Sequence, residues 1–196
     1  MNNRTAALAV VAALAVAASA LAQGNPRGTA TAAVGGKKLT LDYGRPALKG
    51  RSLDVLLKDL PADRIWRAGE NQVTTFTTEG DVLVGGKMVV AGKYSAYVHA
   101  GEGGAWDFVL NKDLGLPLGQ MWAQAPDNMK NEPWPHYTDY SKAIAGSEVA
   151  RVSMKAAKAA QPADLFTITL APKGKGQDLT LAWGTQAWSV EILPAK

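Results

Sequence analysis

The 196-residue sequence contains no cysteine, only two histidines, and no long apolar run beyond its first 22 residues. The absence of cysteine excludes disulfides, thiol catalysis and thiolate metal sites, so the fold must rely on packing and hydrogen bonds. The net charge of +4 is spread along the chain, and it is too small to indicate nucleic-acid binding.

The first 22 residues have the composition of a secretory signal. Arg4 gives a positively charged start, and an almost unbroken run of Ala, Val and Leu follows it. This run is shorter than the roughly 20 apolar residues of a membrane-spanning helix. Residues 20–22 read Ala-Leu-Ala, which is the small-x-small pattern that signal peptidase cleaves, so the mature chain is expected to begin at Gln23. We therefore expect a periplasmic or secreted protein with no membrane span in the mature chain.

The rest of the chain predicts a single all-β domain over residues 29–196, after a flexible leader at residues 23–28. Short runs alternate apolar and polar residues, as in Leu39–Tyr43, Phe166–Leu170 and Leu179–Trp183. Other runs of this kind begin at residues 29, 72, 81, 87, 93, 106, 148 and 187. So many strands joined by short turns predict an antiparallel β-sandwich, jelly-roll-like or barrel-like.

Glycines mark the turns, and one segment has a helical pattern. Gly85-Gly86 and Gly184-Thr185 each separate two strand-like runs and predict tight hairpins. Leucines at helical spacing predict one short helix over residues 53–60, with Ser52 as its N-cap and Pro61 as its stop. This helix would lie in a crossover and cover one end of the sandwich.

Residues 113–140 interrupt the strand pattern with four prolines and no sustained period. Trp122 and Trp134 lie in this predicted long surface loop. Long loops in compact domains are often functional, so these two tryptophans either fold back on the domain or contact a sugar or a protein partner. By contrast, Trp106, Trp183 and Trp188 lie in alternating runs and are expected in the core.

Several short motifs resemble a bacterial family catalogued as a domain of unknown function, DUF2911. They are Leu-Asp-Tyr-Gly-Arg-Pro at residues 41–46, Trp-Arg-Ala-Gly-Glu-Asn at 66–71, Ala-Gly-Lys-Tyr-Ser at 91–95 and Trp-Asp-Phe-Val-Leu-Asn-Lys at 106–112. The resemblance covers nearly all of the mature chain and implies an exported, all-β protein with no established activity. This sequence departs from the family pattern after Trp-Arg, where the family usually has Gly-Ala-Asn-Glu.

The densest group of polar and aromatic residues surrounds the predicted helix. It comprises Tyr43, Arg45, Arg51, Trp66, Arg67, Glu70 and Asn71. Arginine forks bind carboxylates, phosphates or sulfates, and aromatic rings supply stacking faces, so this group is a candidate site for an anionic or saccharide ligand. The alternative is a structural network in which arginines pair with acids such as Asp42 or Glu70. Because the flanking strands enclose one short crossover, the three arginines are expected to converge in space.

Other chemistries have little support in the sequence. His99 and His136 do not stand at a recognised metal-ligand spacing with the nearby acids, so no metal and no cofactor are predicted. No serine lies in a Gly-x-Ser-x-Gly elbow. The preferred interpretation is a non-enzymatic module that binds a ligand or an envelope protein. The alternatives are a carboxylate-dependent hydrolase of envelope or extracellular carbohydrate, using acids such as Glu70, and a purely structural envelope protein.

Overall fold

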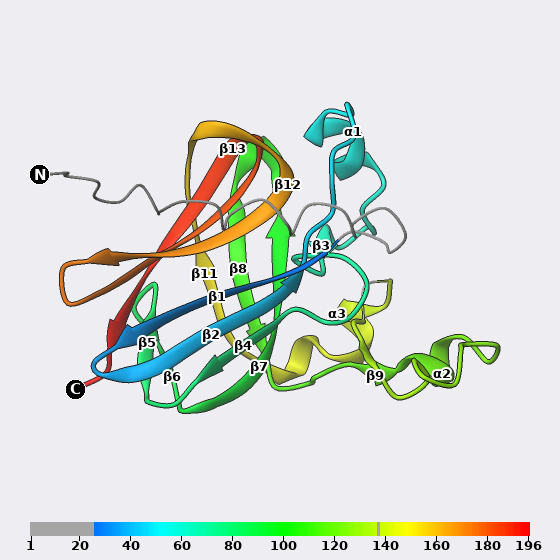
Figure 1. The fold of residues 1–196 in the computed structure, drawn as a ribbon, viewed down its shortest axis with the longest axis horizontal. Helices are drawn as coiled ribbons and strands as arrows, with labels where there is room; N and C mark the ends of the chain where they lie inside the picture. The colour runs from blue at the N-terminus through cyan, green and yellow to red at the C-terminus, as the bar shows by residue number, and fades with distance from the viewer. Residues whose placement is uncertain (1–25, 137) are drawn as a thin grey trace, which may run out of the picture.

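The computed structural model describes residues 26–136 and 138–196, and the predicted signal sequence and its cleavage site lie outside these ranges. Two antiparallel sheets, one of seven strands and one of four, pack against each other (Figure 1). They share one hydrophobic core and do not close into a barrel. The predicted all-β sandwich is confirmed.

The larger sheet contains strands from both halves of the chain. Its members are β1 (Arg27–Val34), β2 (Lys37–Gly44), β3 (Ile65–Trp66), β4 (Thr75–Thr78), β7 (Gly92–Ala100), β8 (Trp106–Asn111) and β11 (Glu148–Ser153). The order is β1-β2-β4-β7-β8-β11, and β3 pairs with β7. The first strand begins at Arg27, which pairs with Gly44. The last two residues of the predicted flexible leader are therefore part of the sheet.

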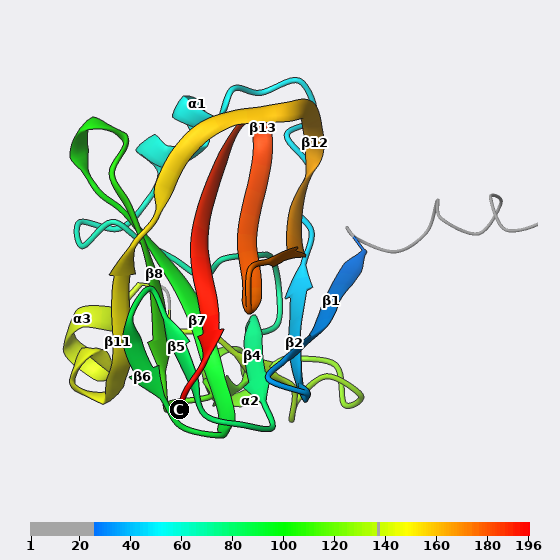
Figure 2. The ribbon, with the colours of Figure 1, turned by 90° about the vertical axis from the view of Figure 1, so that its left-hand side faces the viewer.

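The smaller sheet consists of β5 (Val82–Val84), β6 (Lys87–Val89), β12 (Lys155–Lys173) and β13 (Gly176–Pro194), in the order β12-β13-β5-β6. Its two long strands dominate the sheet, and β12 arches over one end of the sandwich before it descends beside β13 (Figure 2). This sheet covers the inner face of the larger one.

One predicted hairpin is confirmed and the other is wrong. Gly85 and Gly86 join β5 to β6 with φ angles of 54° and 84°, as a tight hairpin requires. By contrast, β13 runs straight through Gly184, which has a φ of 61° and faces Ala163 where the register with β12 shifts. The additional residues at these shifts belong to β12, and Gly184 lies opposite them in β13, where a left-handed glycine kinks a continuous strand instead of forming a turn.

The predicted helix is α1 (Leu53–Lys58), and its N-cap is Ser52, whose hydroxyl accepts a hydrogen bond from the Val55 amide at 3.4 Å. Leucines of α1 and of the turn after it pack against the main core at one end of the sandwich. Two four-residue helices, α2 (Leu118–Met121) and α3 (Tyr140–Ala143), were not predicted, because four residues are too few to show a helical period.

Aromatic side chains fill the core between the sheets. Trp106 and Trp188 stack with ring centroids 3.6 Å apart, and Trp183 is buried as well, which confirms the predicted burial of these three tryptophans. Phe166 and Ile168 of β12 are also buried, as their alternation indicated. Pairs of aromatic rings therefore join the two sheets.

Candidate functional site

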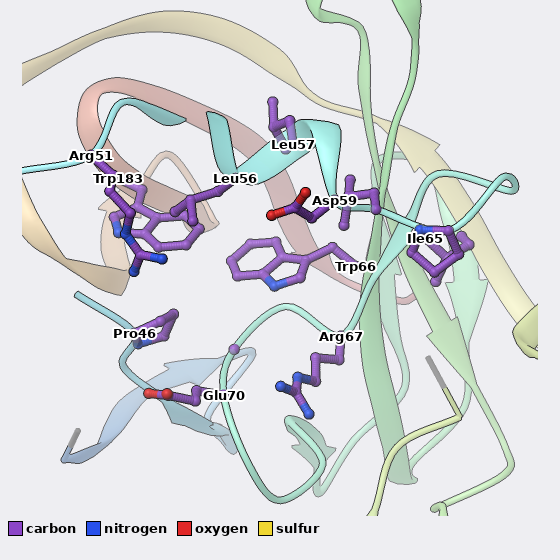
Figure 3. Close-up of a pocket in the computed structure, with 13 residues that line it drawn as sticks. Pro46, Arg51, Leu56, Leu57, Asp59, Ile65, Trp66, Arg67, Glu70 and Trp183 are labelled. Atoms are coloured by element: carbon purple, nitrogen blue, oxygen red, sulfur yellow. The ribbon is translucent and has the colours of Figure 1, made fainter. Parts of the chain in front are cut away.

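A cleft of about 250 Å³ lies at the end of the sandwich that α1 covers (Figure 3). It brings together four of the predicted site residues, Arg51, Trp66, Arg67 and Glu70. The volume is below the roughly 300–1,000 Å³ of pockets that hold drug-sized molecules. Its occupant would accordingly be a small molecule or one side chain of a partner.

The pairing of the strands explains why the segment after β3 enters the cleft. Both β3 and β4 pair with the same edge of β7, where Trp66 faces Val98 and Thr75 faces Ser95. Residues 67–74 join these two short strands, so they must leave the sheet edge and return to it. The resulting loop carries Arg67 and Glu70 to the cleft.

Two indoles, one from each sheet, line the cleft. The rings of Trp66 and Trp183 are nearly parallel, with an interplanar angle of 13° and centroids 5.2 Å apart. Phe166 meets Trp66 edge-on at 4.8 Å. The Trp183 indole N–H donates to the carbonyl of Asp164 at 3.2 Å, which fixes its ring plane. This aromatic surface is therefore preorganised, and Trp66 remains partly exposed beside the cleft.

Arg51 presents an exposed guanidinium to the cleft, and Figure 3 places it beside Trp183. Its Nε donates to the carbonyl of Leu48 at 3.0 Å, and its Nη2 donates to the carbonyl of Ala47 at 3.3 Å. No carboxylate of residues 26–136 or 138–196 forms a salt bridge with it. Backbone carbonyls orient the guanidinium without neutralising its charge, so its positive field reaches the cleft.

The backbone around the cleft is strained. In the described ranges, the non-glycine residues with left-handed φ angles are Lys49, Arg64, Ala68 and Asn71, and all four lie in segments that border the cleft. Such conformations cost on the order of 1 kcal/mol each and cluster at functional sites. At Ala68, which is fully buried, the strained turn is held by the hydroxyl of Thr74, which donates to the Ala68 carbonyl at 2.9 Å.

The backbone of Gly44, at the end of β2, lies directly against the same loop. A Cβ atom at this position would lie 2.0 Å from the carbonyl oxygen of Glu70. Only glycine allows this approach, so the Tyr-Gly-Arg-Pro motif and the Gly-Glu-Asn motif of the sequence meet in space. The loop backbone rests directly on the strand.

A further charged residue of the cleft is Asp59, which the sequence did not indicate. It follows α1, and its backbone N–H donates to the Leu56 carbonyl at 3.3 Å. Its exposed carboxylate points toward the space beside the Trp66 indole (Figure 3). A single acid that follows a helix belongs to no recognisable motif, so sequence reasoning could not place it at a site.

Three predicted site residues do not line this cleft. The buried Tyr43 hydroxyl donates to the carbonyl of Ile168 at 3.2 Å and accepts from its amide at 2.9 Å. Arg45 donates from Nε to the carbonyl of Phe166 at 3.2 Å and from Nη2 to a β12 threonine. Both side chains thus join the two sheets. Asn71 belongs to the strained loop but is outside the lining, so only two of the three arginines, Arg51 and Arg67, meet at the cleft.

Residues 116–134, within the predicted long loop, form an arm that projects from the sandwich (Figure 1). Its strands β9 (Leu116–Pro117) and β10 (Pro133–Trp134) pair with each other, and α2 lies between them. Trp122, just after α2, is 48% exposed, whereas Trp134 is partly buried. The arm is therefore an ordered hairpin rather than an irregular loop, and none of its described residues is in the cleft lining.

The two histidines each lie beside aspartates. His99 Nδ1 is 3.1 Å from Asp107, and His136 Nδ1 is 3.3 Å from Asp139. Across the described ranges, no group of three or more His, Cys, Asp or Glu side chains is arranged to hold a metal ion. Each histidine therefore has an aspartate as a hydrogen-bonding neighbour.

A second, smaller cluster of buried apolar side chains lies on the other face of the large sheet, under α3. Its members include Ile65, Tyr97 and Tyr140, and the two tyrosine rings meet at 4.7 Å. Burial raises the pKa of both tyrosine hydroxyls above the usual value of 10.0. Trp66, the neighbour of Ile65 in β3, packs against the main core and lines the cleft, so β3 is buried on one side and forms the site on the other.

Comparison with known proteins places the chain in a family. In the part of the chain that the structure describes, no helix is long and apolar enough to cross a membrane. No curated protein and no solved structure matches the sequence. The model of the family described as "Protein of unknown function (DUF2911)" matches residues 25–192. The match covers most of the chain, and the chain therefore belongs to the DUF2911 family.

Proposed function

We propose that the protein is an exported binding module whose ligand site is the cleft over Trp66. The observation that supports this most is the exposed guanidinium of Arg51, which backbone carbonyls hold beside two stacked indoles. Among the described residues, this guanidinium forms no salt bridge. Its hydrogen bonds to the backbone nevertheless fix its position, as recognition of an anionic or saccharide ligand requires. The strained loop beside it adds to the argument.

An equilibrium titration tests this proposal. Because Trp66 and Trp183 line the cleft, a ligand entering it should change the intrinsic fluorescence. We expect a response to at least one class in a panel of organic acids, sugar acids, neutral sugars and amino acids. Arg51→Gln should weaken that response, whereas Lys142→Gln, an exposed change on α3, should leave it unaltered. Equal binding by both variants would place the site elsewhere.

Export is part of the proposal and is supported by the sequence alone. The apolar first 22 residues and their Ala-Leu-Ala end favour cleavage before Gln23 and a periplasmic or secreted location. The intact mass of protein recovered from the envelope or the medium should correspond to a chain that begins at or near Gln23. Soluble cytosolic material that retains Met1 would contradict export.

A second candidate function is hydrolysis of a carbohydrate. It is favoured by one observation, namely that Asp59 and Glu70 enter the same cleft from different segments. Glycosidases use two carboxylates, one as acid and one as base or nucleophile. If the cleft is catalytic, Glu70→Gln should abolish turnover of chromogenic glycosides while preserving their binding. Absence of turnover in the wild-type protein with a broad glycoside panel would leave binding as the function.

Two further alternatives concern partners and structure. Trp122 on the projecting arm is the candidate contact for an envelope protein, since an exposed indole is a common interface residue. A purely structural role would require no ligand at all. The arm would be favoured over the cleft if the Trp122→Ala variant no longer captured a partner from an envelope extract while the Arg51→Gln variant still did.

A further inference from the structure

The charges around the cleft are balanced. Two guanidinium groups, Arg51 and Arg67, and two carboxylates, Asp59 and Glu70, contribute to the lining. A simple anion such as sulfate would meet the field of the carboxylates as well as that of the arginines. Charges of both signs at one small site favour a ligand that itself carries both signs.

The remainder of the lining is largely nonpolar. Nine of the thirteen lining residues are Pro, Leu, Ile, Trp or Gly, and these include Leu56, Leu57 and Leu60. A sugar ring carries hydroxyl groups around its whole edge, and each buried hydroxyl needs a hydrogen-bond partner. The leucine side chains have none to offer. Aliphatic walls instead match a hydrocarbon side chain.

Two of the charged groups have positions that suit a zwitterion. Among the described residues, Arg51 forms no salt bridge with a carboxylate, and Asp59 forms none with a cationic side chain. Figure 3 shows the Arg51 guanidinium beside Trp183 and the Asp59 carboxylate over the Trp66 indole; Arg51 precedes α1 and Asp59 lies at its end. Both charged groups therefore line one cleft.

We propose that the cleft binds a free α-amino acid with a nonpolar side chain, an inference that rests on the proposed function of the cleft. The carboxylate of the ligand pairs with Arg51, and its ammonium pairs with Asp59. Its side chain packs against Leu56, Leu57 and the exposed part of Trp66. The cleft volume of about 250 Å³ suits a molecule of this size better than a polymer segment.

Isothermal titration with ligands that lack one charge tests the assignment. The probes are L-leucine, L-phenylalanine, 4-methylpentanoate, which lacks the ammonium of leucine, and 3-methylbutylamine, which lacks its carboxylate. The two single-charge compounds should each bind about 10- to 100-fold more weakly than leucine, since a charged group of the site is left unpaired. Glucuronate and glucose are the two saccharide ligands titrated for comparison.

Two variants assign each charge of the ligand to its partner. Arg51→Gln should weaken binding of leucine and 4-methylpentanoate roughly tenfold or more and leave 3-methylbutylamine unchanged. Asp59→Asn should weaken leucine and the amine by a similar factor and leave the acid unchanged. Both positions are exposed, so both variants should fold, and thermal melts check this.

The outcomes separate this inference from the proposed function. Tighter binding of glucuronate or glucose than of either amino acid, reduced by Arg51→Gln, overturns the amino-acid inference and leaves the cleft as a binding site. Leucine binding that neither variant alters overturns the assignment of the two charges. If none of the six probes binds, the amino-acid inference is also overturned. The proposed function fails with it only if no member of the broader ligand panel binds either.

Discussion

The contact between Gly44 and the cleft loop yields the sharpest test of the structure. A Cβ atom at Gly44 would lie 2.0 Å from the carbonyl oxygen of Glu70 and 2.7 Å from its amide nitrogen, where ordinary contacts are 3.4–4 Å. The obstructing atoms are backbone, so no rotamer change removes the clash. Gly44→Ala must therefore push the loop that carries Arg67 and Glu70 away from β2, or bend the end of the strand.

The cost of this substitution can be estimated from the overlap. Overpacking a well-packed site usually costs about 1–3 kcal/mol and occasionally more. Because the clash involves two backbone atoms of a strained loop, we expect a loss at the upper end, about 3 kcal/mol. A domain of this size loses roughly 2–4 °C of Tm per kcal/mol, so the Tm of Gly44→Ala should fall by roughly 6–12 °C. Thermal melts followed by circular dichroism measure the change.

Gly146→Ala is the matched control. A Cβ atom at Gly146 meets nothing within 4 Å, and its φ is outside the left-handed region, so stability should change by no more than about 0.5 kcal/mol. Equal melting temperatures for the two variants would refute the close approach of β2 to the loop. A second consequence is that Gly44→Ala should weaken ligand binding, because the loop that lines the cleft moves.

The remaining predictions concern the arginines, the core and alkaline pH. Arg45→Ala should lower the free energy of unfolding by about 1–3 kcal/mol in urea melts because its guanidinium donates to β12, whereas Arg51→Ala should lower it by less than about 1 kcal/mol. The reverse order would mean that Arg51 is the structural arginine and Arg45 is not. Ile168→Asp should cost about 3 kcal/mol or more by burying an unpaired charge, and the exposed Thr169→Asp should cost far less; similar losses would mean that both faces of β12 are covered. Burial raises the pKa of Tyr140, so the folded protein keeps a proton that the unfolded chain releases near its pKa of 10.0. Stability should therefore be full below pH 10 and decline above it, and Tyr140→Phe should reduce that decline in urea melts taken across this range.

The sandwich was predictable because its signals are local. Leu39 and Leu41 alternate with polar residues in β2, and their burial follows from the period of a strand. The continuous course of β13 was not predictable from the same kind of signal. A glycine such as Gly184 fits a hairpin turn and a kink within a continuous strand equally well, and the choice between them depends on the partner strand β12.

The candidate site was predictable only in part, for a similar reason. Arg45 and Arg51 look alike in the sequence, yet the partner of Arg45 is Phe166, which lies 121 positions away. Such long-range contacts decide which arginine joins the sheets and which remains at the cleft. Arg67 and Glu70 were identified because they lie in one dense motif, whereas Asp59 joins them only through the course of α1.

The most direct test of a ligand site over Trp66 is an NMR titration of the tryptophan indole N–H signals. The six tryptophans provide six probes, distributed between the core, the cleft and the arm. On addition of L-leucine, the signals of Trp66 and Trp183 should shift in a saturable way, while that of the exposed Trp122 should stay in place. A saturable shift of Trp122 or Trp134, with Trp66 and Trp183 unmoved, would contradict the cleft as the binding site.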